Sequence, residues 1–144
     1  MKFSKIKSYA KVNLSLNVAK KLPSKFHKIE SLVSFINLHD LINLRPIQSN
    51  NHKVYFKGKF AKGINTKNTI TRLLKILDNK KLLNNKKFEI KITKNIPHKS
   101  GMGGGSMNAA SLINYFIKKR IFKLSKKELI NLANLVGSDV ILGV

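Results

Sequence analysis

The sequence predicts an α+β domain in which a β-sheet carries its helices on one face, and three observations support this fold class. Residues 12–18 alternate apolar and polar side chains without a break, which is the period of a half-buried strand. Residues 70–77 place Ile and Leu at spacings of three and four, which is the period of an amphipathic helix. Strand-like segments fill the first half of the chain and helical segments most of the second, an order typical of α+β folds.

The first half of the chain is expected to form strands separated by loops that contain Asn and Gly. The expected strands cover residues 2–9, 12–18, 29–38, 41–44 and 54–56. In the second of these strands we expect every apolar side chain to face the core, because these side chains occupy alternate positions. They are Val12, Leu14, Leu16 and Val18. Lys11 and the polar residues between them then share the opposite face.

The second half is expected to be mainly helical. The expected elements are helices over residues 70–79 and 109–117, with a strand over residues 88–94 between them. Ser125 and Glu128 have the spacing of a capping box, which predicts a last helix beginning after Ser125. Gly137 suits the left-handed position that follows a helix. Residues 140–144 are mostly apolar and are expected to begin a further strand or core segment.

Composition excludes several classes of protein. The chain has 144 residues, 29 basic and 6 acidic side chains, a formal net charge of +23 and no cysteine. This length allows one domain with its own core, and the lack of cysteine excludes disulfides, thiolate metal sites and a cysteine nucleophile. No apolar run reaches the ~18 residues of a membrane helix, and polar residues interrupt the only candidate signal-peptide core. We therefore expect a cytoplasmic protein without a membrane partner.

The positive charge fits either a nucleic acid or an anionic small molecule as partner. Of the 29 basic residues 26 are Lys, and Lys, Asn and Ile make up 58 of the 144 residues, a bias that A/T-rich codons would produce. Proteins that read DNA grooves favour Arg, and single-strand binders interleave aromatic residues. Aromatic residues make up 8% of this chain and do not cluster with lysines. The charge alone therefore does not decide between the two partners.

A glycine-rich segment between an expected strand and an expected helix is the strongest candidate for a binding site. Residues 97–110 read Pro-His-Lys-Ser-Gly-Met-Gly-Gly-Gly-Ser-Met-Asn-Ala-Ala and contain four of the eight glycines. Glycines let the backbone approach a ligand closely, and the unpaired N–H groups of a helix start favour an anion. Ser106 and Asn108 can cap this turn or offer polar atoms to phosphate or Mg²⁺. The P-loop pattern and the acidic residue of the dinucleotide fingerprint are absent.

Three further segments match one known family together with the glycine-rich segment. They are Ala-Lys-Val-Asn-Leu-Ser-Leu at residues 10–16, Phe-His-Lys-Ile at residues 26–29 and Gly-Ser-Asp-Val at residues 137–140. With residues 97–110 these motifs resemble, in order and spacing, the galactokinase–homoserine–mevalonate–phosphomevalonate (GHMP) kinases. The resemblance implies the ribosomal protein S5 domain 2-like fold and a GHMP kinase N-terminal domain over residues 1–144. The family's C-terminal domain is absent from this chain, so we expect these residues alone to be inactive or nearly so.

The resemblance also implies ATP as cofactor, with Mg²⁺ delivered by ATP. The ATP-binding residues that it implies in the loop are Pro97, His98, Lys99, Ser100, Gly101, Met102, Gly103, Gly104, Gly105, Ser106 and Met107. Asn68 and Lys94 match positions near the family's adenine pocket. The sequence departs from the family pattern at residues 98–100, which make the front of the loop stiffer and more cationic. Met107 replaces a serine and removes one hydroxyl that could contact phosphate.

For catalysis the resemblance assigns Lys11 as the catalytic lysine and Asp139 as the base that receives the proton of the substrate hydroxyl. Lys11 has a physical argument of its own, because residues two apart on a strand lie ~6.6–6.8 Å from each other and Lys11 and Asn13 can contact one ligand. The resemblance places Asn13 at the sugar-alcohol end of the substrate, and Phe26 and His27 against its cytosine. The histidines show no metal-ligand spacing, so no protein metal cage is predicted.

Four other acids have local explanations in the sequence. Asp78 and Glu89 are expected on solvent faces of regular elements, Glu128 belongs to the capping box, and Asp40 is expected at a strand turn. None of these four is predicted to take part in catalysis.

Within the family, the Phe-His pair and the Ala-Lys-x-Asn-Leu strand favour a substrate that carries cytidine diphosphate. The implied reaction is phosphorylation of the 2-hydroxyl of 4-diphosphocytidyl-2-C-methyl-D-erythritol in non-mevalonate isoprenoid synthesis. Another small-molecule kinase of the family, such as homoserine kinase, is one alternative. An RNA-binding domain of the same fold class is the other, and its RNA affinity would depend strongly on salt.

Overall fold

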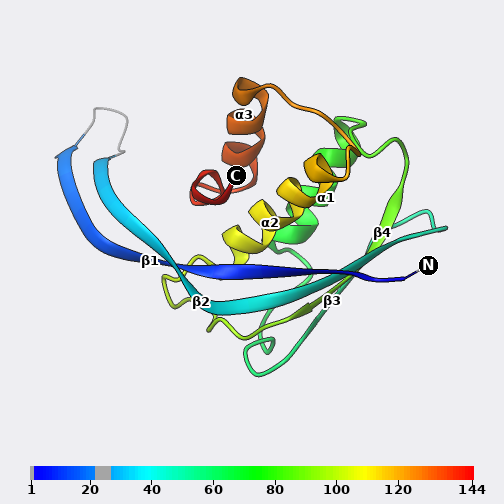
Figure 1. The fold of residues 1–144 in the computed structure, drawn as a ribbon, viewed down its shortest axis with the longest axis horizontal. Helices are drawn as coiled ribbons and strands as arrows, with labels where there is room; N and C mark the ends of the chain where they lie inside the picture. The colour runs from blue at the N-terminus through cyan, green and yellow to red at the C-terminus, as the bar shows by residue number, and fades with distance from the viewer. Residues whose placement is uncertain (1, 22–26) are drawn as a thin grey trace.

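The computed structural model describes residues 2–21 and 27–144, with side chains described for residues 2–17 and 30–144. It confirms the α+β prediction, because a mixed sheet carries its helices on one face (Figure 1). The elements in chain order are β1 (Ser4–Lys21), β2 (His27–Ile47), β3 (Lys53–Lys57), α1 (Thr69–Asn79), β4 (Lys87–Thr93), α2 (Gly104–Lys118), α3 (Lys126–Val136) and the 3₁₀-helix η1 (Val140–Gly143).

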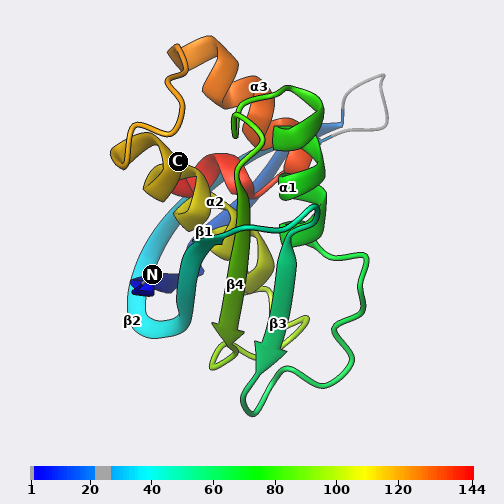
Figure 2. The same cartoon turned by 90° about the vertical axis from the view of Figure 1, so that its right-hand side faces the viewer.

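The four strands are arranged in the order β1-β2-β4-β3. β1 pairs with β2 and β2 with β4 in antiparallel orientation, whereas β3 and β4 run side by side in the same direction (Figure 2). A parallel pair requires a crossover connection, and here that connection contains α1. Because β4 is an inner strand, the glycine-rich segment that follows it begins in the middle of the sheet.

Local capping explains where two of the three α-helices begin. Asn68 accepts hydrogen bonds from two N–H groups in the first turn of α1, and the capping box of Ser125 and Glu128 begins α3 as predicted. α2 begins differently, because its N-cap residue is Gly103 in the left-handed conformation, with φ of 67° and no side-chain cap. The start of α2 is therefore shaped by glycine backbone and by its neighbours.

The core lies between the covered face of the sheet and the three helices. The inner strands contribute alternate, fully buried residues, namely Ile42, Leu44, Ile90 and Ile92. The helices contribute the opposite layer, which includes Leu73, Leu77, Leu112, Ile113, Phe116 and Ala133. Burial of these apolar side chains fixes the helices on the sheet and so fixes the start of α2 relative to β4.

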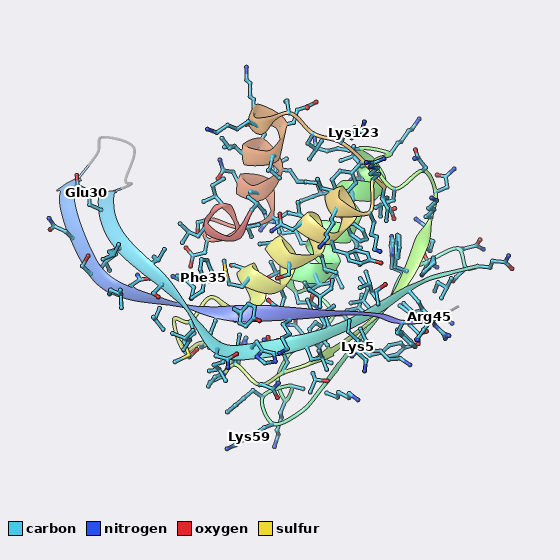
Figure 3. The ribbon with its side chains drawn as sticks, in the orientation of Figure 1. Lys5, Glu30, Phe35, Arg45, Lys59 and Lys123 are labelled. Carbon is cyan, nitrogen blue, oxygen red and sulfur yellow. The ribbon has the colours of Figure 1, made fainter. Side chains whose placement is uncertain are left out.

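β1 and β2 are longer than the segments predicted for them. The expected strands over residues 2–9 and 12–18 are one strand, and those over residues 29–38 and 41–44 merge into β2. The two strands extend beyond the helices as an arm, with Glu30 toward its far end and Arg45 at the opposite end of β2 (Figure 3).

The prediction that the apolar residues of 12–18 face the core is wrong for two of them. Leu14 and Leu16 have exposed fractions of 64% and 58%. The alternation does predict a strand, but none of the described residues forms a second layer over the arm. Burial of a strand face depends on such a layer, which periodicity cannot reveal.

Of two expectations for the C-terminal residues, one is wrong and the other holds in one of its two forms. Gly137 has a φ of 174°, which is extended backbone and not the left-handed conformation. Residues 140–143 form η1 and not a strand, but Val140 is buried in the core and Ile141 and Val144 pack against it, so the core-segment alternative is confirmed. No helix among the described residues is long and apolar enough to cross a membrane.

Candidate functional site

The glycine-rich segment forms a loop between β4 and α2 in which three residues have positive φ angles. Lys99, Gly101 and Gly103 have φ of 58°, 75° and 67°. The N–H of Lys11 donates to the carbonyl of Met102 at 3.0 Å, so the loop is fastened to β1. In the described part of the chain no side chain caps the first turn of α2, and its N–H groups are available to a ligand. Such a helix start favours an anion.

Neighbouring side chains crowd the Cβ position at two glycines of this helix start. A Cβ at Gly104 would lie 3.1 Å from Lys94 Nζ and 3.2 Å from Ile96 Cγ2. A Cβ at Gly105 would lie 3.1 Å from Thr69 Oγ1. Larger residues would push the turn away from β4 or from α1. The glycines thus allow close packing of the helix start against these side chains, and the predicted approach to a ligand stays a prediction.

The front of the loop is held by its own side chains. Ser100 Oγ donates to the carbonyl of Pro97 at 2.9 Å and accepts from the N–H of Met102 at 3.3 Å. The side chain of Met107, in the first turns of α2, is buried. Ser100 and Met107 therefore have structural contacts, whereas the glycines between them are exposed or half-buried.

A cavity of about 800 Å³ lies beside the loop, on the side of α1. Its lining includes Ile64, Asn68, Lys75, Lys94, His98 and Gly105. Both residues that the sequence placed near an adenine pocket, Asn68 and Lys94, are thus on its wall. The Asn68 amide is already engaged, since it caps α1 and donates to the carbonyl of Asn65 at 2.9 Å. Asn68 therefore shapes the wall of the cavity.

The structure brings the two predicted catalytic residues together, although they are 128 positions apart. Lys11 Nζ lies 3.4 Å from Asp139 Oδ2, and the exposed fractions of the two side chains are 5% and 46%. Lys11 also borders the loop, because a Cβ at Gly103 would lie 3.4 Å from Lys11 Cε. An ammonium group and a half-exposed carboxylate therefore meet at the glycine-rich helix start.

The predicted substrate-binding residues lie on the arm. Asn13 is exposed and lies two residues beyond Lys11 on β1. His27 is the first residue of β2, and its side chain is outside the described part of the chain. Phe26 is outside the described residues altogether. The contacts predicted for Phe26 and His27 stay predictions.

Asp40 is a buried carboxylate that sequence reasoning missed, because it lies inside β2 with no exposed surface and not at the expected strand turn. Asp40 accepts hydrogen bonds from four donors, namely the N–H groups of Asn95 and Ile96 at 2.8 and 2.9 Å, Asn108 Nδ2 at 2.9 Å, and Lys94 Nζ. One signal was present in the sequence, because Asp40 continues the alternation of the core residues Ile42 and Leu44. An acid in register with core positions is buried together with them.

Asn108 and Glu89 also differ from expectation. Asn108 does not cap α2, since its side chain is buried and bonded to Asp40. Glu89 is buried on β4, where it accepts from Arg45 Nε at 2.7 Å and pairs with Lys91 Nζ at 3.1 Å. Hydrogen bonds from Arg45 and Lys91 hold the pKa of Glu89 below its ordinary value of 4.5. The described residues contain no group of three or more His, Cys, Asp or Glu that could hold a metal ion.

Comparison with known proteins gives consistent matches. Residues 68–144 match the GHMP kinases N-terminal domain. Over 140 residues the chain is 61% identical to the 4-diphosphocytidyl-2-C-methyl-D-erythritol kinase of Pelagibacter ubique, covering 97% of this chain and 50% of that protein. The protein of the same name from Thermosipho africanus is 36% identical over 139 residues, covering 94% of this chain and 46% of that protein.

A solved structure matches as well. A crystal structure of 4-(cytidine 5'-diphospho)-2C-methyl-D-erythritol kinase superposes with a TM-score of 0.76 at 25% identity, covering 96% of this chain and 48% of that one. The chain spans about half the length of the curated relatives it matches.

Proposed function

The chain belongs to the GHMP kinase family, and from this premise we propose that it takes part in the ATP-dependent phosphorylation of the 2-hydroxyl of 4-diphosphocytidyl-2-C-methyl-D-erythritol. The observation that carries the proposal is the Lys11–Asp139 pair beside the glycine-rich start of α2, with 3.4 Å between Nζ and Oδ2. The names of relatives at 61% and 36% identity support the choice of substrate. In these relatives the matched region is about half the protein, and we propose that a second domain completes the site.

The proposed reaction forms a bond between the hydroxyl oxygen and the terminal phosphorus of ATP, while the bond from that phosphorus to ADP breaks. ATP supplies the phosphoryl group. The hydroxyl proton passes to Asp139, whose side chain is 46% exposed and can meet a substrate oxygen. The Lys11 ammonium stabilises the negative charge that develops on the hydroxyl and phosphoryl oxygens.

The glycine-rich loop fits a phosphate chain. The uncapped N–H groups at the start of α2 supply donors, and the space that a Cβ would fill at Gly104 and Gly105 is closed by neighbours. We propose that backbone between Gly101 and Ser106 holds the phosphates and that the cavity near Asn68 and His98 holds the adenine.

The proposed Mg²⁺ enters with ATP. Mg²⁺ prefers oxygen ligands, and the hydroxyl oxygen of Ser106 is of this kind. A Cβ at Gly137 would lie 3.9 Å from Ser106 Oγ, so Ser106 borders the segment that carries Asp139. Because the described residues form no cage of acids and histidines, most ligands of the ion would come from phosphate and water. Both proposed substrates are charged metabolites, which is consistent with a reaction in the cytoplasm.

The nucleotide part of the proposal is tested by calorimetric titration of the 144-residue chain with ATP. We expect saturable binding that is retained at high salt, because a shaped site depends less on salt than contacts to a polyanion. Binding of RNA that weakens steeply with salt, without binding of ATP, would support the RNA-binding alternative.

The reaction is tested with a fusion of this chain to the C-terminal half of the Pelagibacter relative. We expect ADP formation with 4-diphosphocytidyl-2-C-methyl-D-erythritol and none with homoserine, and little ADP formation by the 144-residue chain alone. Turnover of homoserine in place of the cytidine compound would favour the other kinase reaction.

A further inference from the structure

Asp40 joins three segments that meet beneath the glycine-rich loop. Its Oδ1 accepts the N–H groups of Asn95 and Ile96, which directly follow β4, at 2.8 and 2.9 Å. Its Oδ2 accepts Asn108 Nδ2 of α2 at 2.9 Å and Lys94 Nζ. Both oxygens are fully used and the side chain has no exposed surface, so Asp40 cannot receive a substrate proton as Asp139 can.

Lys94 links Asp40 to the start of α2, because it contacts both. Its side chain is buried, and the Cβ position at Gly104 lies 3.1 Å from its Nζ. An ammonium beside the N-terminus of a helix faces the positive end of the helix dipole, which is unfavourable without a counter-charge. Asp40 supplies that counter-charge and holds the ammonium against the first residue of α2.

Asn108 shows which interaction sets the geometry. Its Oδ1 is buried and has no hydrogen-bond partner among the described residues. An unpartnered buried acceptor is destabilising, so satisfying the Asn108 carbonyl is not what orients this amide. The amide instead turns its N–H toward the carboxylate of Asp40.

We propose that Asp40 is a positioning residue for phosphate binding. It holds the end of β4, the Lys94 ammonium and the first turns of α2 in the arrangement that presents the loop N–H groups to an anion. This inference rests on the proposed ATP site and goes beyond it, because Asp40 lies under the loop and not in the cavity lining.

The test compares Asp40→Asn with the original chain in binding of ATP and of adenosine. An Asn amide at this position would place an N–H group against the donors of Lys94 and Asn108 and leave the ammonium unpaired. Charge-assisted hydrogen bonds contribute enough that we expect ATP affinity to fall about tenfold. Adenosine lacks phosphates, so its affinity stays the same and the ratio of the two affinities falls about tenfold.

Two control variants separate this function from loss of a buried polar group. Ser8→Ala removes a buried hydroxyl directly opposite Asp40 on β1, one that has no partner among the described residues. Glu89→Gln removes another buried carboxylate, which lies on β4 five residues before Lys94. Both should leave the affinity ratio within about twofold of the original chain.

Amide hydrogen exchange without ligand adds a second readout. We expect Asp40→Asn to speed exchange at residues 101–106 while the amides of α1 keep their rates. Asn108→Ala leaves three of the four hydrogen bonds to Asp40, so it should give the same effects at smaller size. If Asp40→Asn does not fold, Asn108→Ala replaces it in the test. Faster exchange spread equally over α1 would show general loss of stability and overturn the proposal.

The outcomes separate the two proposals. If the original chain binds ATP but the variants keep its affinity ratio, the positioning function of Asp40 is overturned and the ATP site stands. If the original chain does not bind ATP, the proposed function fails and the positioning of phosphate fails with it.

Discussion

Two lysine–aspartate pairs border the glycine-rich loop, and they differ in the exposure of the carboxylate. In the pair of Lys94 and Asp40 the exposed fractions are 5% and 0%, and backbone and amide donors occupy the rest of the carboxylate. In the pair of Lys11 and Asp139 the lysine is equally buried at 5% but the aspartate is 46% exposed. The same two types of side chain therefore occur once in a closed pair, Lys94 and Asp40, and once in an open pair, Lys11 and Asp139.

This difference shows how the environment of chemically identical groups decides which functions are open to them. A carboxylate that is buried and fully hydrogen-bonded fixes the positions of its donors. A carboxylate that keeps one side open can accept a proton from a ligand. The neighbouring lysine adds charge in both cases, and in the proposed function the charge of Lys11 acts on the substrate that meets Asp139.

The largest expected effect comes from removing the proton acceptor of the open pair, which is Lys11 and Asp139. Asp139→Asn should lower turnover of the fusion enzyme by about 10³-fold, because the amide cannot receive the hydroxyl proton. ATP affinity should change by less than about threefold, since the N–H groups of the loop are untouched. Steady-state kinetics and calorimetry measure the two quantities. Wild-type turnover by this variant would remove Asp139 as the base.

Lys11→Met removes the ammonium of the open pair and keeps the apolar stem. The backbone bond from residue 11 to the Met102 carbonyl stays, so the loop remains fastened. We expect turnover to fall about 10²-fold through loss of charge stabilisation. Lys7→Met, at an exposed lysine of the same strand, is the matched control and should keep its turnover. Equal losses in both variants would contradict the assignment.

Gly104→Ala tests the rigidity of the closed pair. The added methyl would meet Lys94 Nζ at 3.1 Å, and Asp40 prevents that ammonium from moving away. We expect ATP affinity to fall about tenfold, in the range of a ~1.4 kcal/mol change. Gly137→Ala is the control, because its methyl would lie 3.6 Å from its nearest neighbour, Val140, on extended backbone. Unchanged ATP affinity in Gly104→Ala would show that the Lys94 ammonium can move away from the added methyl group although it is bound to Asp40.

A third polar cluster, distant from the loop, gives a background pH dependence. His52 Nδ1 accepts from the N–H of Phe88 at 3.1 Å, and Nε2 lies 3.3 Å from Asp78. Burial lowers the pKa of His52 below its ordinary 6.5, although the bond to Asp78 opposes this shift. For Asp78, burial raises the pKa, but hydrogen bonds from Lys87 and His52 outweigh it and the net pKa lies below 3.8.

The direction of each pH dependence of stability follows from proton binding in the folded and unfolded states. Unfolded His52 binds a proton more readily than folded His52, so stability falls as the pH drops from 6.5 through the lower folded pKa. The stability due to Asp78 is present above pH 3.8 and is lost as the pH falls through its lower folded pKa. His52→Gln should reduce the loss of Tm between pH 6.5 and the lower folded pKa by about 1–3 °C. A variant with an unchanged Tm profile would contradict this account.

Local features of the sequence were sufficient for several elements. The box of Ser125 and Glu128 predicts the start of α3 because the donor and acceptor lie three residues apart. The apolar period of residues 70–77 predicts α1 because it describes one helix face. The glycines at 103–105 predict a close approach of the backbone to a ligand, which stays a prediction, and the structure shows that Gly104 and Gly105 also lie close to protein side chains. The pairing of Lys11 with Asp139 followed from family resemblance and not from spacing.

The sequence alone therefore determined the α+β class, the starts of α1 and α3 and the presence of a glycine-rich loop, because each depends on residues within one or two turns. It placed the start of the helix after this loop at residue 109, whereas α2 begins at Gly104, because the first turn of α2 is made of glycines that carry no apolar period. Tertiary structure decided that Leu14 and Leu16 are exposed, since burial of a strand face requires a covering layer. It also decided that Asp40 is closed and Asp139 open. The hydrogen-bond partners of Asp40 are 54 to 68 positions away, and Lys11, which pairs with Asp139, is 128 positions away from it. Hydrogen bonds at such separations exist only after the sheet and the helices have packed.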